Sequence, residues 1–167
     1  MHPVFMDHSI FVALGSNLGD RLANLRSAVG ALPPQIAVLA SSPVYETAPW
    51  GVVEQPVFLN MAVRAKTRLS PQDVLHFLKA LEVRLGREPS IRWGPRRIDL
   101  DLLFYDTLVL DTPELVLPHP RLQERAFVLV PLSDLAPEFV HPQLGRSVQE
   151  LLDSIGEEGI VRYGTLS

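Results

Sequence analysis

Apolar and polar positions along the chain predict six main elements of secondary structure. Four strand-like runs, in which apolar and β-branched residues dominate, are Ser9 to Leu14, Ile36 to Tyr45, Phe58 to Ala65 and Ile98 to Phe104. Two other segments have apolar residues three or four positions apart, which is helical spacing: Asp20 to Leu32 and the segment that follows Ser70. The predicted order is β-α-β-β-α-β.

Local signals mark the ends of these elements. Pro33-Pro34 ends the first helix, because the residue before a proline is disfavoured in helical conformation. Ser70-Pro71-Gln72-Asp73 is a helix start, with serine as N-cap and proline at the first position, and Gly86 ends that helix. Phe104 to Leu110 is predicted to be a hairpin, and a short helix near Val148 to Leu152 belongs to the structural close of the domain, residues 141 to 167.

This order predicts an α+β fold of the ferredoxin-like type, in which helices cover one face of an antiparallel sheet. The other face is then left for loops and ligand, with additional C-terminal elements after Leu110. At 167 residues, with 47% apolar and 20% charged residues, we expect one domain over 1–167, preceded by a loosely ordered extension at 1–8.

Charge and composition narrow the classes of partner. The net charge of −4 argues against a nucleic-acid-coating surface, yet five of the thirteen arginines crowd into the fourteen residues from Arg84 to Arg97. That cluster favours a small anionic ligand. The chain has no cysteine, no signal-peptide pattern at its start and no apolar run of about 20 residues, so we expect a cytoplasmic protein without a membrane partner.

The stretch Arg92 to Leu103 carries the densest chemistry. If Ile98 to Phe104 is a strand, Asp99 and Asp101 share one face and Leu100 lies on the other. Two adjacent carboxylates beside arginines suit Mg²⁺ and a polyphosphate. For the acid pair alone, an edge strand with ordinary charged residues is the preferred interpretation. The flanking Arg92, Arg96 and Arg97 reverse that preference in favour of a ligand site. The segment predicts a site for Mg²⁺ and a nucleoside triphosphate.

Other polar groups are less specific. Gly15 to Asp20 lacks the ending of a phosphate-binding Walker loop. A helical turn would put Arg121 and Arg125 on one side, although a plain surface turn explains them equally well, and His119 alone is more often structural. Asn60 offers hydrogen bonds to a heterocycle. Aromatic rings such as Phe58 and Phe127 could sandwich it, with core packing as the simpler alternative.

Taken together, these segments resemble the 6-hydroxymethyl-7,8-dihydropterin pyrophosphokinases of folate biosynthesis. The resemblance spans about residues 9 to 140, and its most specific part is the pattern Arg-Trp-Gly-Pro-Arg-x-x-Asp-Leu-Asp. The matching segments are Ala13 to Asn17, Tyr45 to Pro49, Gln55 to Asn60, Gly86-Arg87, Arg92 to Leu103, Pro118 to Arg121 and Arg125 to Leu129.

The resemblance implies a reaction and a role for each matching residue. The hydroxymethyl oxygen of the pterin attacks the β-phosphorus of ATP, AMP departs, and the diphosphoryl group is transferred. Asp99 and Asp101 would bind two Mg²⁺, and Arg87 and Arg92 would clamp the phosphates from a mobile loop, which makes these four the implied catalytic residues. The implied ATP contacts are Arg87, Arg92, Trp93, Arg96, Leu102, His119, Arg121 and Arg125. The implied pterin contacts are Thr47, Ala48, Trp50, Phe58, Asn60 and Phe127. A monomer is the family expectation.

Two departures from the family pattern concern only the finer contacts. Glu88 to Ile91 is a short loop without a basic residue of its own, and Glu114 stands where some relatives have a basic residue near the adenosine. No general base is assigned, and Asp99 is the nearest acceptor.

Two other functions remain open at this point. A Mg²⁺-dependent phosphohydrolase would release phosphate from ATP without pterin. A ferredoxin-like module for a nucleotide or RNA would turn over nothing, but it fits poorly with acids on the sheet face.

Overall fold

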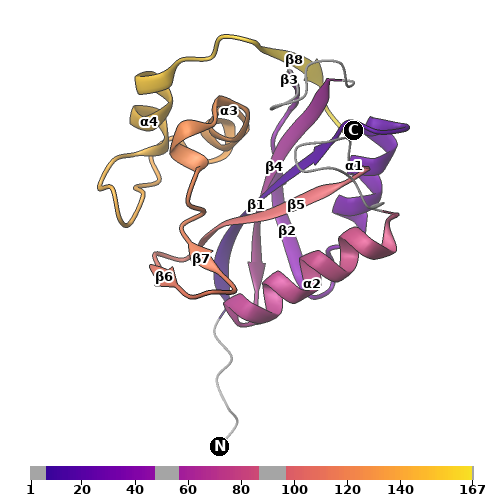
Figure 1. Ribbon diagram of the computed structural model, residues 1–167, viewed down its shortest axis with the longest axis horizontal. Helices are drawn as coiled ribbons and strands as arrows, with labels where there is room; N and C mark the ends of the chain where they lie inside the picture. The colour runs from indigo at the N-terminus through magenta and orange to yellow at the C-terminus, as the bar shows by residue number, and fades with distance from the viewer. Residues whose placement is uncertain (1–6, 48–56, 87–96, 167) are drawn as a thin grey trace, which may run out of the picture.

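The computed structural model describes residues 7–47, 57–86 and 97–166. In chain order, its elements are β1 (His8–Ser16), α1 (Arg21–Gly30), β2 (Ile36–Ser41), β3 (Val44–Thr47), β4 (Phe58–Thr67), α2 (Pro71–Arg84), β5 (Asp99–Tyr105), β6 (Leu110–Asp111), β7 (Val116–Leu117), a 3₁₀ turn (Leu122–Glu124), α3 (Ala126–Leu135), α4 (Val148–Ile155) and β8 (Ile160–Gly164). Figure 1 shows their arrangement.

The main sheet confirms the predicted ferredoxin-like topology. Within the described residues its strand order is β5-β1-β4-β3-β8, and β2 pairs with β4 beyond the end of β3. Every pairing in it is antiparallel. The two central strands, β1 and β4, pair along their whole shared length, from His8 opposite Thr67 to Ser16 opposite Leu59. The sheet is therefore a rigid frame for residues at the β5, β1 and β4 ends where Asp99, Gly15 and Asn60 lie.

Helices α1 and α2 cover one face, as the apolar spacing predicts (Figure 1). Asp20 caps α1 by accepting a hydrogen bond from the Ala23 amide, and Ser70 caps α2 by accepting one from the Asp73 amide, at 3.1 and 3.2 Å. Between these helices and the sheet lies an aliphatic core that takes alternate residues of each strand. Its strand members include Ile10, Val12 and Leu14 of β1, Leu59, Met61 and Val63 of β4, and Leu100 and Leu102 of β5.

The opposite face is only partly open, which corrects the expectation that it is left to loops and ligand. Helices α3 and α4 pack on it around a second core that contains Phe11, Phe104 and Leu129. Helix α4 has the predicted position and a full capping box between Ser147 and Glu150. Strand β8 then returns to the sheet and pairs with β3. The C-terminal elements therefore narrow the area in which a ligand can reach the sheet.

Two segments differ from the sequence prediction. The run predicted as one strand, Ile36 to Tyr45, is divided into β2 and β3 at Ser42-Pro43, where the Ser42 hydroxyl accepts a hydrogen bond from the Ala62 amide at 2.9 Å. The hairpin predicted over Phe104 to Leu110 is wrong. Asp106, at φ 48°, turns the chain away after β5, and the short β6 pairs with β7.

None of the helices in the described ranges has the length and apolar character that a membrane crossing requires.

Candidate active site

A row of residues crosses the uncovered part of the sheet in register. Asp99 of β5 lies opposite Gly15 of β1, Gly15 opposite Asn60 of β4, and Asn60 opposite Tyr45 of β3. Residues directly opposite one another in antiparallel strands project to the same face. This face is the one that α3 and α4 approach, because the neighbouring residues Leu14, Leu59 and Leu100 point into the α1–α2 core. The acid pair and Asn60 thus share a face, two strand spacings apart.

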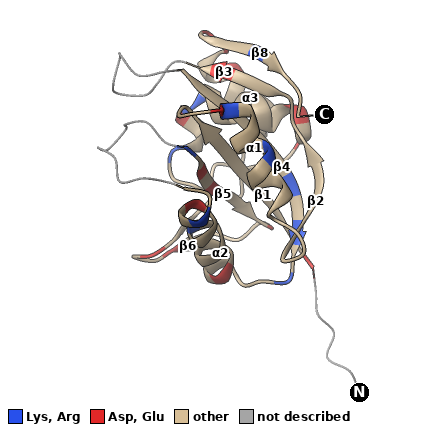
Figure 2. Ribbon diagram, turned by 90° about the vertical axis from the view of Figure 1, so that its right-hand side faces the viewer, with Lys and Arg blue, Asp and Glu red and all other residues tan. Residues whose placement is uncertain are grey.

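Asp99 and Asp101 stand on that face at the edge of the sheet, as the sequence predicts. Both are half-buried, whereas Leu100 between them is buried in the core. Burial raises the pKa of Asp101 to about 7, and the neighbouring Asp99 carboxylate acts in the same direction. Lys79 and Arg125 act against this shift. Figure 2 shows acidic and basic positions close together where β5 begins. Two partly buried carboxylates this close together repel each other when both are ionised, and cations bound beside them would reduce that repulsion.

Helix α2 supports the acid pair from behind. Glu82, whose side chain is 1% exposed, accepts a hydrogen bond from the Leu100 amide at 2.7 Å. Its other carboxylate oxygen lies 3.3 Å from the Lys79 ammonium. The helical spacing places Glu82 near the buried face and predicts an arginine or ligand partner, with a salt bridge along the helix as the ordinary alternative; the structure shows that alternative, with Lys79. Because Leu100 separates Asp99 from Asp101, the Glu82 bond fixes the backbone between the two acids.

His119, Arg121 and Arg125 complete the charged end of the face. The His119 amide donates to the Leu103 carbonyl at 3.0 Å, which holds this segment against β5. Burial lowers the pKa of His119 to about 4, Arg125 adds to the effect, and Asp99 opposes it. The neutral ring accepts from the Arg121 amide at Nδ1 (3.3 Å), so its proton resides on Nε2. His119 is a neutral hydrogen-bond donor at this site.

The two arginines flank a 3₁₀ turn, Leu122–Glu124, where the sequence left a helical turn and a plain surface turn equally open. Arg125 lies at its end, where α3 begins, and its amide donates to the Leu122 carbonyl at 3.2 Å. Both arginines nevertheless lie close enough to His119 to lower its pKa. The structure therefore brings Asp99, Asp101, His119, Arg121 and Arg125 together.

The other end of the row is uncharged and suits a flat ring. The Asn60 amide nitrogen donates to the Thr47 hydroxyl at 2.5 Å, and both side chains are buried. Gly15 makes room for the Asn60 and Phe58 side chains, since a Cβ there would lie 2.8 Å from Asn60 Oδ1 and 3.6 Å from the Phe58 ring. Thr47, Phe58 and Asn60 thus lie together over Gly15. The sequence prediction ends this strand at Leu14, but in the structure Gly15 is still part of β1.

Helix α3 brings Phe127 to the same face. The Arg125 guanidinium lies over the Phe127 ring, 5.6 Å from its centroid, and so links the aromatic group to the charged end. At the far end of α3, Asp134 accepts a hydrogen bond from the Tyr45 hydroxyl, and Tyr45 lies in register with Asn60. Sequence patterns give no sign of this bond, because 89 residues separate its partners.

Several predicted site residues are not brought to this face or lie outside the described residues. The Leu102 side chain is 5% exposed and packs in the α1–α2 core, which turns it away from the acid pair. Ala48, Trp50, Arg87, Arg92, Trp93 and Arg96 fall outside the described ranges. Lys79 is the charged group that the sequence analysis missed; its position three residues before Glu82 is the available signal.

The donor set fits Mg²⁺. Carboxylate oxygens are the ligands that Mg²⁺ prefers, and the raised pKa of Asp101 shows that a cation beside it would be favoured. In the described part of the chain, no cluster of three or more acidic, histidine or cysteine side chains is arranged to hold a metal ion. Oxygens from water and substrate phosphates would complete the coordination, which is usual for Mg²⁺ in phosphoryl-transfer sites.

A ferredoxin-like sheet with an acid pair, arginines and a polar end on one face is suited to a protein that binds a polyphosphate and a ring. Comparison with known proteins identifies the family. Residues 11–137 match the family model of 7,8-dihydro-6-hydroxymethylpterin-pyrophosphokinase.

Individual relatives agree with this match. The chain is 43% identical over 159 residues to a 2-amino-4-hydroxy-6-hydroxymethyldihydropteridine pyrophosphokinase of Pseudomonas aeruginosa, which covers 94% of this chain and 98% of that protein. It is 46% identical over 132 residues to the Bacillus subtilis protein of the same name, covering 78% and 79%.

Among solved structures, Plasmodium falciparum HPPK-DHPS has the same fold, with a TM-score of 0.78 and 17% identity over 95% of this chain. The chain spans about half of that protein, 49% of its length.

The chain therefore belongs to the 7,8-dihydro-6-hydroxymethylpterin-pyrophosphokinase family, and the predicted family, fold class and enzyme class are confirmed. It is a diphosphotransferase of folate biosynthesis, with ATP as the donor and the hydroxymethyldihydropterin as the acceptor.

Proposed function

We propose that the uncovered sheet face is the active site of this transfer, with a polyphosphate end at β5 and a ring end at β4. The observation that carries the proposal is the in-register row from Asp99 through Gly15 to Asn60. Strands β5 and β4 are two spacings apart, about 10 Å. A two-ring heterocycle with a one-carbon arm can cover that span, so a pterin held at Asn60 would bring its hydroxyl close to phosphates held at Asp99 and Asp101.

At the polyphosphate end, Asp99 and Asp101 would hold two Mg²⁺. Bound there, the ions would neutralise charge on the phosphate oxygens as it redistributes during transfer. Arg121 and Arg125, beside His119, would bind further phosphate oxygens, while His119 Nε2 would donate a hydrogen bond without adding charge. Arg87, Arg92, Trp93 and Arg96 would add nucleotide contacts. Leu102 would contribute through its backbone, because its side chain lies in the core.

At the ring end, Thr47 and Asn60 would orient the heterocycle, and Phe58 and Phe127 would sandwich it. The Thr47–Asn60 hydrogen bond pre-sets the Asn60 amide, so less ordering is needed when the ring binds. Ala48 and Trp50 would complete this end. The chain's own groups would thus position the two substrates, which is the main requirement of phosphoryl transfer.

We also propose that the protein is a monomer in the cytoplasm, that residues 1–167 form one domain, and that its ligands are small molecules rather than nucleic acid or membrane. The net charge of −4 and the local clustering of arginines support the small-molecule ligands.

The experiment is a product assay with purified protein, ATP and Mg²⁺, with and without 6-hydroxymethyl-7,8-dihydropterin. AMP should form in step with pterin diphosphate and only when pterin is present. ADP or phosphate released without pterin would favour the phosphohydrolase alternative, and no nucleotide turnover would favour a binding module.

The assignment of Arg92 has its own test in the same assay. Arg92→Ala should lower the turnover number more than it weakens ATP binding, because a phosphate clamp acts mainly on the charge that develops during transfer. An unchanged turnover number with weaker ATP binding would contradict the clamp.

A further inference from the structure

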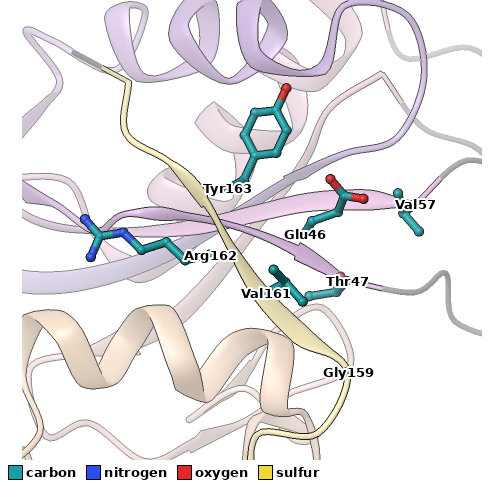
Figure 3. Close-up of a pocket in the computed structure, with 7 residues that line it drawn as sticks. All are labelled: Glu46, Thr47, Val57, Gly159, Val161, Arg162 and Tyr163. Atoms are coloured by element: carbon teal, nitrogen blue, oxygen red, sulfur yellow. The ribbon is translucent and has the colours of Figure 1, made fainter.

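A recess lies at the sheet edge where β3 pairs with β8. It encloses about 330 Å³, which is within the range of small-molecule sites, and Figure 3 shows the residues around it. Glu46 lies opposite Val161 in the β3–β8 pairing, so these two side chains project to the same side. Tyr45 and Thr47, next to Glu46 along β3, project to the other side, toward the candidate active site. The Glu46 carboxylate therefore faces away from the metal-binding pair.

Specific side-chain contacts hold the walls of the recess in place. The Arg21 guanidinium lies over the Tyr163 ring at 5.8 Å, and its Nη1 donates to the Val57 carbonyl at 2.8 Å. Arg21 thus holds the end of β8 and the start of β4 in fixed relation. Val57 and Val161 supply apolar surface, and Tyr163 supplies an aromatic ring that is half exposed, at 49%. A flat ligand would find both an apolar wall and a ring to pack on.

Glu46 supplies the one carboxylate among the described residues that line the recess. Its side chain is half-buried, and among the described residues no hydrogen bond or ion pair engages it. In Figure 3 its carboxylate points to the same side of the strands as the Tyr163 ring, while Arg162 points away. An ionised carboxylate accepts two parallel N–H bonds side by side. The matching ligand is a flat ring that presents two adjacent N–H donors along one edge.

We propose that this recess is a second ring-binding site, in which Glu46 accepts both N–H bonds of a 2-aminopyrimidinone edge. Pterins and guanine share that edge, with an exocyclic amino group beside a ring N–H. The choice of a pterin as the ligand rests on the proposed function, because a pterin is a substrate of this protein only if that function is correct. Thr47 lines the recess and also accepts the Asn60 bond, so the two ring sites adjoin through one residue.

The test is a titration followed by amide NMR shifts, with oxidised 6-hydroxymethylpterin as the probe and no ATP. In the unaltered protein, the amides of Val161 and Tyr163 should shift together with that of Asn60. Glu46→Gln should lose the β8 shifts and keep the Asn60 shift. Asn60→Ala should keep the β8 shifts. Glu158→Gln, which removes an exposed carboxylate just before β8, is the matched control and should change neither set.

A guanosine titration separates the two sources of the ring edge. If guanosine shifts the β8 amides and the pterin does not, the ligand is a purine and the pterin source is wrong. If neither ring shifts them, or if the shifts survive Glu46→Gln, the recess is not the proposed site. A failure of the proposed function looks different: Asn60→Ala and Asp99→Ala would keep full turnover, whatever the β8 amides show.

Discussion

The two faces of the sheet use the same strands for opposite purposes. The face under α1 and α2 is filled by aliphatic side chains that are at most a few per cent exposed, such as Leu14, Leu59 and Leu100. The face toward α3 carries Asp99, Asn60 and Tyr45 across the same strands. Strand alternation alone separates the two sets. The packed face supplies stability, and it holds the other face still enough for charged and polar groups to be placed in register.

The largest expected effect is on the acid pair. Asp99→Asn or Asp101→Asn should lower turnover at least about 100-fold, because a neutral amide neither attracts Mg²⁺ nor balances the arginines. AMP formation at saturating substrates measures it. Asp111→Asn, an exposed acid on β6, is the control and should behave like the unaltered protein. Wild-type rates in Asp101→Asn would remove the metal-pair proposal.

The neighbouring position should show the reverse pattern. Leu100→Ala leaves a cavity in the α1–α2 core and should lower the free energy of unfolding by about 2–5 kcal/mol. Urea denaturation measures that loss, and turnover of the folded fraction should fall much less than in Asp101→Asn. If Leu100→Ala abolished turnover while the protein stayed stable, the assignment of stability to one face and catalysis to the other would be wrong.

The acid pair should also cost stability when no metal is bound. The pKa of Asp101 is raised from 3.8 to about 7, so between these pH values the folded protein holds a proton that the unfolded chain has released. Its contribution to stability therefore falls as pH rises through that window. His119 has the opposite sign, because its pKa is lowered from 6.5 to about 4. Its contribution rises as pH rises from about 4 to 6.5.

The pH dependences of stability from Asp101 and His119 have opposite signs and offset each other. Single substitutions should reveal each one separately. In the presence of a chelator, Asp101→Asn should leave stability rising from pH 4.5 to 6.5, and His119→Gln should leave it falling. Each effect should be about 1–3 kcal/mol, since one pKa unit corresponds to about 1.4 kcal/mol and both groups keep some solvent screening. Urea unfolding at three pH values measures them. Identical pH dependence in both variants would contradict the assignment.

The smallest expected effect concerns the link between β3 and α3. Burial raises the pKa of Tyr45 to about 12, and its hydrogen bond to Asp134 adds to this. Removing the bond with Tyr45→Phe should cost about 1 kcal/mol and raise KM for the pterin severalfold, with kcat and KM for ATP unchanged, because α3 carries Phe127. Asp134→Asn should add little to Tyr45→Phe, whereas Asp153→Asn on α4 is the control. Full additivity would show that the two side chains act separately.

Much of the fold follows from the sequence, because it rests on local patterns. The spacing of Leu25, Ala28 and Leu32 marks α1, and Ser70-Pro71 marks the start of α2 to the residue. The break at Ser42-Pro43 and the turn at Asp106 were missed, since both depend on partners far along the chain: the Ala62 amide for Ser42 and the Ser9 amide for Asp106. Local propensity carries no information about such partners.

For the candidate site, the sequence by itself determined which groups are present and which of them share a strand face. Alternation put Asp99 and Asp101 together and Leu100 opposite, and the structure agrees. Only the tertiary structure decided what stands around them. The register of β1 with β4 and β5 set Gly15 beneath Asn60 and aligned both with Asp99. Packing of α2 and of residues 119–125 brought Glu82, Lys79, His119 and Arg125 to the acids. Pairing register and helix docking are set by the summed fit of whole surfaces, which no single segment of the chain contains.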